Sequence, residues 1–340
     1  MRRLPSSLLA VALLACLSCS KDPPPSDPPA SGDAPPATDA PAAQTDDLPP
    51  QLAAQLRRQE ARAKEISARF TPELQAELDA LVSAGYPTPE AALDAILASP
   101  HRAPGNADRD RHRHPKETLV FFGLRQDMKV FEYAQGAGWY TEILAPFLAK
   151  QGTLYLTGYD GTSEDPQQRY GARAVELFLT APGNLYAKVQ TVTQPDLQAP
   201  PVLGQPDSLD MVLVIRMMHN VHRAGMWDRL MPAIHQALKP GGVLGVVQHR
   251  ATDDADPDQS APKGYLPEPW LVQKVEGYGF RLDARSDVNA NPKDTKDYDK
   301  GVWTLPPTLQ LGETDRAKYE AIGESDRSTL RFVKVAEGGA

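Results

Sequence analysis

The feature that most constrains the fold is the alternation of strand-like and helix-like segments from about residue 117 onward. Short apolar runs rich in β-branched and aromatic residues are separated by amphipathic stretches long enough for helices. The run at 209–217 is of the kind found in strands buried on both faces of a parallel sheet. The alternation predicts an α/β fold, a Rossmann-like, doubly wound and mostly parallel sheet of seven strands. The expected strands are 128–134, 153–160, 184–192, 209–217, 243–249, 281–288 and 329–335.

Residues 51–115 are expected to form a helical N-terminal extension ahead of the α/β domain at 116–335. Thr71 and Thr88 are each followed by a proline and an acidic residue. Threonine is a good N-cap, and proline suits the first helical position because its missing N–H is not needed there. Leucine and isoleucine at helical spacing then give both helices an apolar face. The sequence predicts a helical cap packed on the main domain.

The first residues predict export. A basic start and an apolar run at 8–17 fit a secretory signal peptide at 1–15, since a membrane-spanning helix needs roughly 20 apolar residues. The segment at 13–16 resembles a bacterial lipobox, so Cys16 is the expected lipidated residue, with Cys19 as the alternative. A plain signal peptide that happens to contain cysteine is the other interpretation.

Residues 16–50 are expected to be a disordered tether, because they are rich in proline and aspartate and contain too few apolar residues for a core. Leu17, not aspartate, follows Cys16, which favours an outer-membrane lipoprotein facing the periplasm. The only two cysteines lie in this N-terminal part, so the domain has neither a disulfide nor a cysteine zinc site. The formal net charge of -8 disfavours nucleic acid as a partner.

A glycine turn follows the first expected strand, in the stretch VFEYAQGAGWYTEILAP at 130–146. In doubly wound sheets ligands bind beyond the carboxyl ends of the strands, and glycines there leave the backbone uncovered. The dinucleotide fingerprint G-x-G-x-x-G does not fit, since its third glycine would fall on Thr141 or on Trp139. A nicotinamide or flavin enzyme is therefore disfavoured.

An ordered set of residues resembles another family. It comprises Glu132 at the end of the first strand, the glycine turn, Asp160 at the end of the second, Asp210 opening the fourth, and LKPGG at 238–242. Over roughly 130–335 the chain resembles the class I S-adenosylmethionine-dependent methyltransferases. The stretches GWYTEILAP and RHPKETLVFFGL also resemble a small group of exported, predicted methyltransferases whose substrates are unassigned.

The resemblance implies S-adenosyl-L-methionine as cofactor. It implies that the backbone at Gly136 and Gly138 approaches the methionine part and that Glu132 holds the ammonium. The chain departs from the family at Ala134, where the first glycine usually stands.

One residue is a candidate for binding the ribose of the cofactor, and another is a candidate for binding the adenine. Asp160 would accept hydrogen bonds from both ribose hydroxyls, as an acid about 20 residues after the glycines does in such folds. The alternative is a turn aspartate before Gly161. Asp196 is the candidate on the adenine side.

The acceptor side is expected at the end of the fourth strand. His219 and Asn220 are the candidate catalytic residues, because a base is needed where the acceptor loses a proton. His249 ends the fifth strand and is a candidate substrate contact, and a surface or capping role is the alternative for each histidine. Trp139 and Tyr140 could stack on the ligand or pack the helix onto the sheet, and we expect ligand contact for one of them and packing for the other.

A basic, histidine-rich segment at 101–117 precedes the domain. Arg113 and His114 are candidates for binding an anionic substrate. A metal site is not expected in this segment. Its histidines do not have the i, i+4 spacing of metal ligands on a helix, and the segment offers no clear third carboxylate ligand. The alternative is structural, with Arg109, Asp110 and Arg113 forming ion pairs that attach the segment to the domain.

These features predict a methyltransferase that uses S-adenosylmethionine on a small-molecule or envelope-associated acceptor. The alternative is a non-catalytic ligand-binding or scaffolding lipoprotein with a degenerate methyltransferase fold. A nicotinamide oxidoreductase would have to bind its cofactor without the third glycine. The sequence does not identify the acceptor or the oligomeric state.

Overall fold

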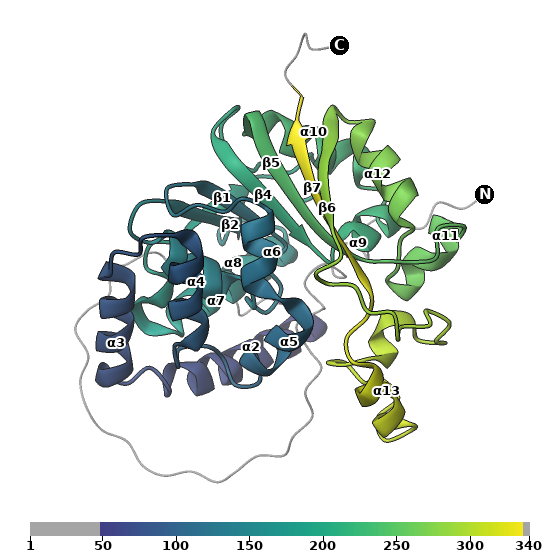
Figure 1. Ribbon diagram of the computed structural model, residues 1–340. Coiled ribbons are helices and arrows are strands. Elements are labelled where there is room, and N and C mark those ends of the chain that lie inside the picture. Colours follow the sequence, from purple (N-terminus) through teal and green to yellow (C-terminus); the bar gives the residue numbers. More distant parts are fainter. Residues whose placement is uncertain (1–47, 336–340) are drawn as a thin grey trace.

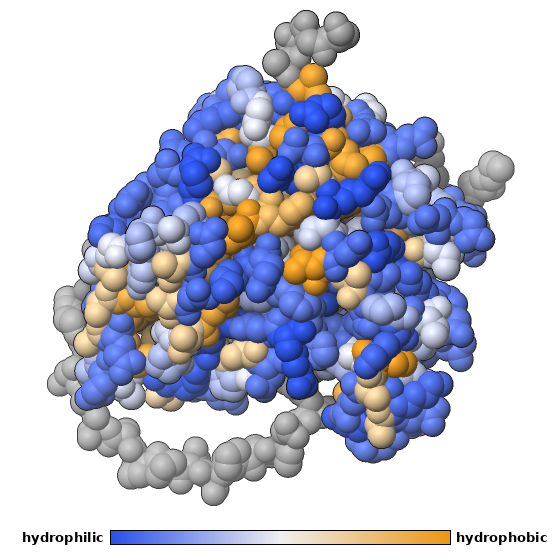
Figure 2. Space-filling view, in the orientation of Figure 1, coloured by the Kyte–Doolittle hydropathy of each residue, from blue (hydrophilic) through white to orange (hydrophobic). Residues whose placement is uncertain are grey.

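The computed structural model of the protein describes residues 48–335 (Figure 1). The predicted signal peptide, Cys16, Cys19 and most of the predicted tether lie outside the described residues. Over 48–335, no helix combines the length and the apolar character needed to cross a membrane. The face shown in Figure 2 is mostly hydrophilic, with small scattered hydrophobic patches.

The centre of the molecule is a seven-stranded sheet in the order β3-β2-β1-β4-β5-β7-β6. Neighbouring strands are parallel from β3 through β5, and β7 is antiparallel to both β5 and β6. The expected Rossmann-like, mostly parallel α/β fold is confirmed. The strands are β1 (Lys129–Tyr133), β2 (Thr153–Tyr159), β3 (Gln190–Gln194), β4 (Leu209–Ile215), β5 (Leu238–His249), β6 (Phe280–Ser286) and β7 (Arg327–Lys334).

Helices cover both faces of the sheet, because alternate residues of each strand point to opposite sides. Val130 and Met211 belong to a core with α4 and α7, while Phe131 and Val212 belong to a core with α10 and α12. The α-helices of the described residues are α2 (Pro50–Ser67), α3 (Pro72–Ser83), α4 (Pro89–Ala98), α5 (Asp110–Arg113), α6 (Pro115–Phe121), α7 (Thr141–Leu148), α8 (Pro166–Thr180), α9 (Met218–Arg223), α10 (Trp227–Ala237), α11 (Pro257–Ser260), α12 (Glu268–Glu276) and α13 (Arg316–Ile322).

The N-terminal helices pack directly on the α/β core. Thr71 and Thr88 cap α3 and α4 as expected, each hydroxyl accepting a hydrogen bond from a backbone N–H. Leu93 and Ile96 of α4 are almost fully buried in the core that contains α7. Burying one such side chain stabilises the fold by about 1.5–3 kcal/mol, so the helical extension contributes substantially to the stability of the domain.

Two elements differ from the sequence-based expectation. The stretch GWYTEILAPFLAK at 138–150 predicts a helix from residue 138. This helix, α7, begins only at Thr141, because Gly136 and Gly138 have φ values of +58° and +79°, outside the helical region. The strand expected at 184–192 is a 3₁₀ turn at Gly183–Tyr186 followed by β3. The apolar residues of that turn pack into the core of the α7 side, which explains the misleading pattern.

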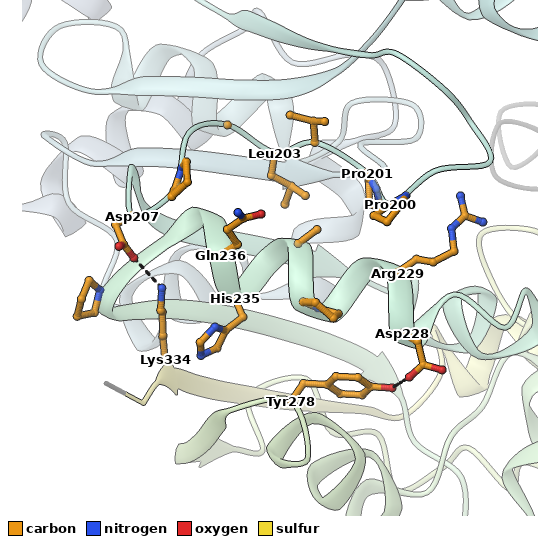
Figure 3. Close-up of a pocket in the computed structure, with 16 residues that line it drawn as sticks. Pro200, Pro201, Leu203, Asp207, Asp228, Arg229, His235, Gln236, Tyr278 and Lys334 are labelled. Carbon is orange, nitrogen blue, oxygen red and sulfur yellow. Dashed lines mark hydrogen bonds and ion pairs between the residues drawn. The ribbon is translucent and has the colours of Figure 1, made fainter. Parts of the chain in front are cut away.

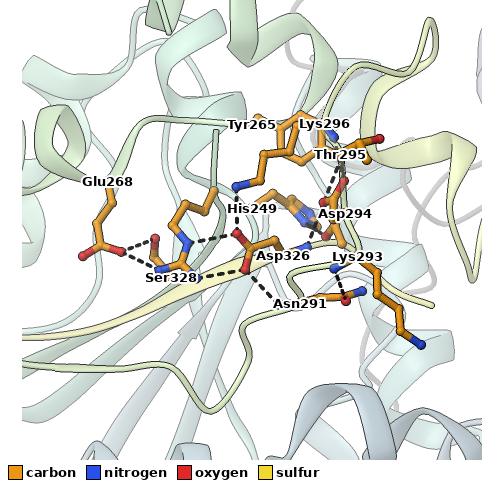
Figure 4. A network of polar contacts seen from close by, with 12 residues as sticks. His249, Tyr265, Glu268, Asn291, Lys293, Asp294, Thr295, Lys296, Asp326 and Ser328 are labelled. Carbon is orange, nitrogen blue, oxygen red and sulfur yellow. Dashed lines mark hydrogen bonds and ion pairs between the residues drawn. The ribbon is translucent and has the colours of Figure 1, made fainter. Parts of the chain in front are cut away.

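The connection between β6 and β7, residues 287–326, lies at the carboxyl edge of the parallel strands, because β7 starts there and runs back. Asp326 anchors it by accepting from Arg250 at 3.0 and 2.9 Å and pairing with Lys296 at 2.9 Å. Figure 4 shows this network beside His249, whose Nδ1 lies 2.5 Å from Ser325 Oγ. The connection therefore forms a fixed wall next to the end of β5.

Candidate functional site

The turn after β1 combines three residues with positive φ. Gly136 faces open space, since an added Cβ would find only the Ala134 carbonyl, at 4.0 Å. At Gly138 an added Cβ would lie 2.4 Å from the Phe178 ring, so this glycine is required for packing against α8. Ala134 adopts φ +54°, a left-handed conformation that costs a non-glycine residue about 1–2 kcal/mol. The open backbone on which a ligand can lie is at Gly136.

Glu132 is buried at the carboxyl end of β1, with 4% of its surface exposed. The Thr141 hydroxyl donates to Glu132 Oε2 at 2.6 Å. Burial raises the pKa of Glu132 to about 8, and the hydrogen bond from Thr141 opposes this only in part. Among residues 48–335 no cationic side chain forms an ion pair with this carboxyl group. A buried carboxyl group of this kind is suited to receive a cation from a ligand.

Asp160 lies in the turn after β2. Its Oδ1 accepts from the Thr162 hydroxyl at 2.7 Å and from the Thr162 N–H at 2.8 Å, and these bonds lower its pKa. Its own N–H donates to Gln168 Oε1 at 3.0 Å. Asp160 therefore has the turn geometry of the structural alternative, and its Oδ2 is not used in these bonds.

Two buried glutamines hold the neighbouring turns in place. Gln168 Nε2 donates to the Gln194 carbonyl at 2.8 Å, which links α8 to the end of β3. Gln194 in turn bonds both the N–H and the carbonyl of Val202, at 2.8 Å each. Asp196 is exposed within the loop so formed and accepts from the Gln198 N–H at 2.7 Å. The loop geometry is thus set by glutamines that the sequence reasoning missed.

His219 and His249 meet at the ends of β4 and β5, with ring centroids 5.7 Å apart. Gln248 lies 3.4 Å from His219 Nδ1, and Trp303 of the β6–β7 connection is 6.1 Å away, edge-on. Burial lowers the pKa of His219 to about 4 and that of His249 well below its ordinary value. Both rings are therefore neutral at pH 7 and able to accept a proton.

The predicted neighbours of this pair have other contacts. Asn220 bonds within its own helical turn, to Met217 Sδ at 3.5 Å and to Arg223 Nη1 at 3.3 Å. Trp139 and Tyr140 are both buried and lie edge to face, 4.8 Å apart. The structure does not place the side chain of Asn220 in contact with His219 or His249.

Arg113 and the basic segment reach the same edge of the sheet. Arg113 Nε pairs with Glu324 at 2.9 Å, and Arg109 Nε pairs with the same carboxylate at 3.1 Å. Asp110 pairs with Arg102. The ion pairs expected to attach the segment to the domain are confirmed for Arg109 and Arg113, whereas Asp110 pairs within the segment. His114 is partly buried, has φ +40° and forms the junction of α5 and α6.

Arg216 is a site residue that the sequence reasoning did not single out. It follows β4 directly, has φ +57° and lies among Arg113, Glu324 and the two histidines. Burial first, and then the charge of Arg113, lower its pKa well below the ordinary value. The available signal was a charged residue directly after the apolar run at 211–215, because such a side chain is placed at the carboxyl edge.

Residues at the opposite edge of the sheet, where the parallel strands begin, hold neighbouring strands together. Asp210 accepts from the Lys129 N–H at 2.7 Å and from Lys239 Nζ at 2.5 Å, which ties β4 to β1 and β5. A cavity of about 900 Å³ also lies there, bordered by Asp207 and Lys334, which pair at 2.7 Å (Figure 3). Asp210 lies where β4 begins, at the end of the strand opposite the glycine turn, whereas the cavity extends along α10 as far as Asp228 and Arg229.

Residues 48–335 contain no group of three or more histidine, cysteine, aspartate or glutamate side chains placed to hold a metal ion.

The chain matches no protein-family model and no curated protein sequence. Solved structures with a similar fold include an S-adenosylmethionine-dependent methyltransferase from Aquifex aeolicus, 15% identical with a TM-score of 0.42, covering 72% of this chain and 98% of its own. One from Methanosarcina mazei is 14% identical with a TM-score of 0.42, covering 64% and 98%. A geranyl diphosphate C-methyltransferase from Streptomyces coelicolor is 12% identical with a TM-score of 0.42, covering 75% and 88%.

Proposed function

We propose that the protein is a methyltransferase that uses S-adenosylmethionine. The observation that carries the proposal is Glu132, a carboxyl group buried without a cation at the carboxyl end of β1, beside a turn whose backbone is open at Gly136. A buried carboxyl group costs less free energy when a ligand ammonium pairs with it. The α-ammonium group of the cofactor meets this requirement.

The residues at the edge fit the rest of the cofactor. Glu132 would hold the ammonium, the backbone at Gly136 would lie against the methionine part, and Asp160 would bind the ribose hydroxyls through the oxygen not used in its turn. When bound, the cofactor supplies an electrophilic methyl group on a sulfonium. The protein aligns the acceptor with that group and excludes water.

On the acceptor side, His219 and His249 are the groups proposed to take a proton. Burial keeps both rings neutral at pH 7, so each has a nitrogen lone pair, but their lowered pKa values make them weak bases. Gln248 positions the His219 ring, and Trp303 covers it from the β6–β7 connection. The acceptor is proposed to be a small molecule or an envelope-associated molecule.

Calorimetric titration of the purified protein with S-adenosylmethionine and S-adenosylhomocysteine tests the proposal. Micromolar binding that is lost in Glu132→Gln and weakened in Asp160→Ala supports it. Asp127→Ala is the matched control, because Asp127 is exposed and pairs only with Arg125 at the amino edge. Absence of binding at millimolar ligand refutes the proposal and leaves the ligand-binding or scaffolding lipoprotein.

The location is a second proposal, supported by residues 1–50 of the sequence. We propose a lipoprotein anchored through Cys16 and facing the periplasm. Membrane fractionation of Cys16→Ser and Cys19→Ser variants tests it. Release of only the Cys16→Ser variant supports Cys16 as the anchor, and release of only the Cys19→Ser variant transfers the role to Cys19.

A further inference from the structure

We propose that Arg113, Arg216 and Arg327 form an oxyanion site that binds a carboxylate or phosphate group of the methyl acceptor. That the bound molecule is a methyl acceptor rests on the proposed function, whereas the binding of an oxyanion does not. The arginine cluster consists of these three residues together with Arg109 and Glu324.

The arginine cluster is assembled from three distant parts of the chain. Arg109 and Arg113 come from the segment at α5, Arg216 follows β4, and Arg327 opens β7 beside Glu324. In Figure 1, α5 and the segment that leads from α13 into β7 approach the same edge of the sheet. Three guanidinium groups meet there at the Glu324 carboxylate, and the charges of all four groups act on Arg216 at the end of β4.

Glu324 compensates only part of this positive charge. It accepts from Arg113 Nε at 2.9 Å, from Arg327 Nη1 at 3.0 Å and from Arg109 Nε at 3.1 Å. It is the one carboxylate among the main charged neighbours of Arg216, the others being Arg113, Arg109 and Arg327. One carboxylate against four guanidinium groups leaves an excess of positive charge in a buried place, where like charges repel strongly.

Several donors of the cluster are buried without a hydrogen-bond partner. Within the described chain these are Arg113 Nη1 and Nη2, whose guanidinium carbon lies 4.8 Å from the centre of the Trp139 ring, and Arg327 Nε. Arg113 and Arg327 are 2% and 3% exposed, so solvent does not satisfy these groups either. An unpartnered buried donor is unfavourable, more so when it is charged. The guanidinium fork matches carboxylate and phosphate oxygens, so a bound oxyanion would satisfy both the charge and the donors.

Arg216 connects the cluster to the histidine pair. It keeps part of its surface exposed, which gives an oxyanion access. Burial is the main cause of the lowered pKa of His219 and His249, and the charge of Arg216 adds to the lowering in both. An acceptor held at Arg216 by its oxyanion group therefore has the rest of its structure beside the two neutral histidines.

The cluster is separate from the proposed cofactor ammonium site. The pKa of Glu132 is set by burial and by the Thr141 hydroxyl, without a contribution from any arginine. Tyr140, by contrast, is affected by Arg113, Arg216 and Arg327, whose charges oppose the rise that burial causes in its pKa. Glu132 lies in β1 and Arg216 directly follows the neighbouring strand β4, so the two sites are adjacent at one edge of the sheet and differ in the charge that they bind. We therefore assign the oxyanion site to the acceptor.

Calorimetric titration of the full chain with inorganic phosphate and with acetate tests the proposal, because these probes carry only the group that the cluster would recognise. We expect binding of at least one probe at about 1–10 mM. Arg216→Gln should weaken it at least tenfold, and Arg216→Lys, which keeps a point charge, less strongly. Arg125→Gln is the control, since Arg125 is 58% exposed and lies at the amino edge.

Both probes failing to bind, or binding equally well to Arg216→Gln, would overturn the proposal. Titration with S-adenosylmethionine in the presence of phosphate separates it from the proposed function. Independent binding of the two ligands supports an acceptor site, and competition between them would overturn it by placing the cluster in the cofactor site. Phosphate binding to a protein that does not bind S-adenosylmethionine would refute the cofactor alone and leave the oxyanion site in place.

Discussion

Cofactor binding is expected to release a proton below pH 8, because Glu132 has to ionise to pair with the ammonium. Burial holds the pKa of this carboxyl group at about 8 in the free protein. At pH 7 about 0.9 of a proton is therefore bound to it. Ionising the group at pH 7 costs about 1.4 kcal/mol, which the new ion pair has to offset.

This linkage makes affinity rise with pH. The association constant should increase about ninefold between pH 6 and pH 7, since the fraction of ionised Glu132 increases by that factor. The association constant should be measured between pH 5.5 and 7. In this range the ligand's own α-amino group, with a pKa of about 7.7–8.0, stays mostly protonated. Above that range the ligand loses the charge that Glu132 recognises.

Titration calorimetry in two buffers of different ionisation enthalpy counts the released protons directly. S-adenosylhomocysteine carries the same amino group and should show the same release, whereas 5′-methylthioadenosine lacks it and should show none. An affinity independent of pH over this range would refute the reasoning. Proton release that persists in Glu132→Gln would also refute it, by assigning the release to another group.

Three further predictions concern stability. The raised pKa of Glu132 means that the folded protein holds a proton at a pH where the unfolded chain has lost it, so the free energy of unfolding should fall by up to about 5 kcal/mol between pH 4.5 and pH 8. Glu132→Gln should flatten this profile in urea melts at pH 5 and pH 8.5, and an unchanged profile would contradict the assignment. Gly138→Ala should destabilise by about 1–3 kcal/mol because the new methyl meets the Phe178 ring, and the cost should be partly recovered when combined with Phe178→Leu in thermal melts. Glu324→Gln should cost about 3–5 kcal/mol, since it leaves buried arginines uncompensated, and added phosphate should restore part of the melting temperature only if the arginine cluster binds it.

Local patterns in the sequence predicted most of the elements. The caps at Thr71 and Thr88 depend on a hydroxyl and an N–H three residues away, and both formed as expected. The alternation of apolar and amphipathic segments predicted the mostly parallel sheet, since each strand has to be buried between helices. It failed at residues 184–192, where the apolar side chains pack into the core from a 3₁₀ turn.

The positions of Glu132, Gly136 and Asp160 at strand ends also followed from the chain alone, because parallel strands bring their carboxyl ends to one edge. The protonation of Glu132 did not follow. Its pKa depends on how completely α7 and its neighbours exclude water from it, which is a property of packing.

The set of residues that come together on the acceptor side depends on the tertiary structure. Arg113 and Glu324 are separated by 211 positions, and no local pattern pairs them. His249 meets His219 because β5 lies next to β4, and Ser325 reaches His249 because β7 runs antiparallel to β5. Sequence determines what depends on neighbouring residues along the chain, namely helices, strands and turns. The charge balance and burial of the arginine cluster depend on segments that meet only after folding, and only the tertiary structure decided them.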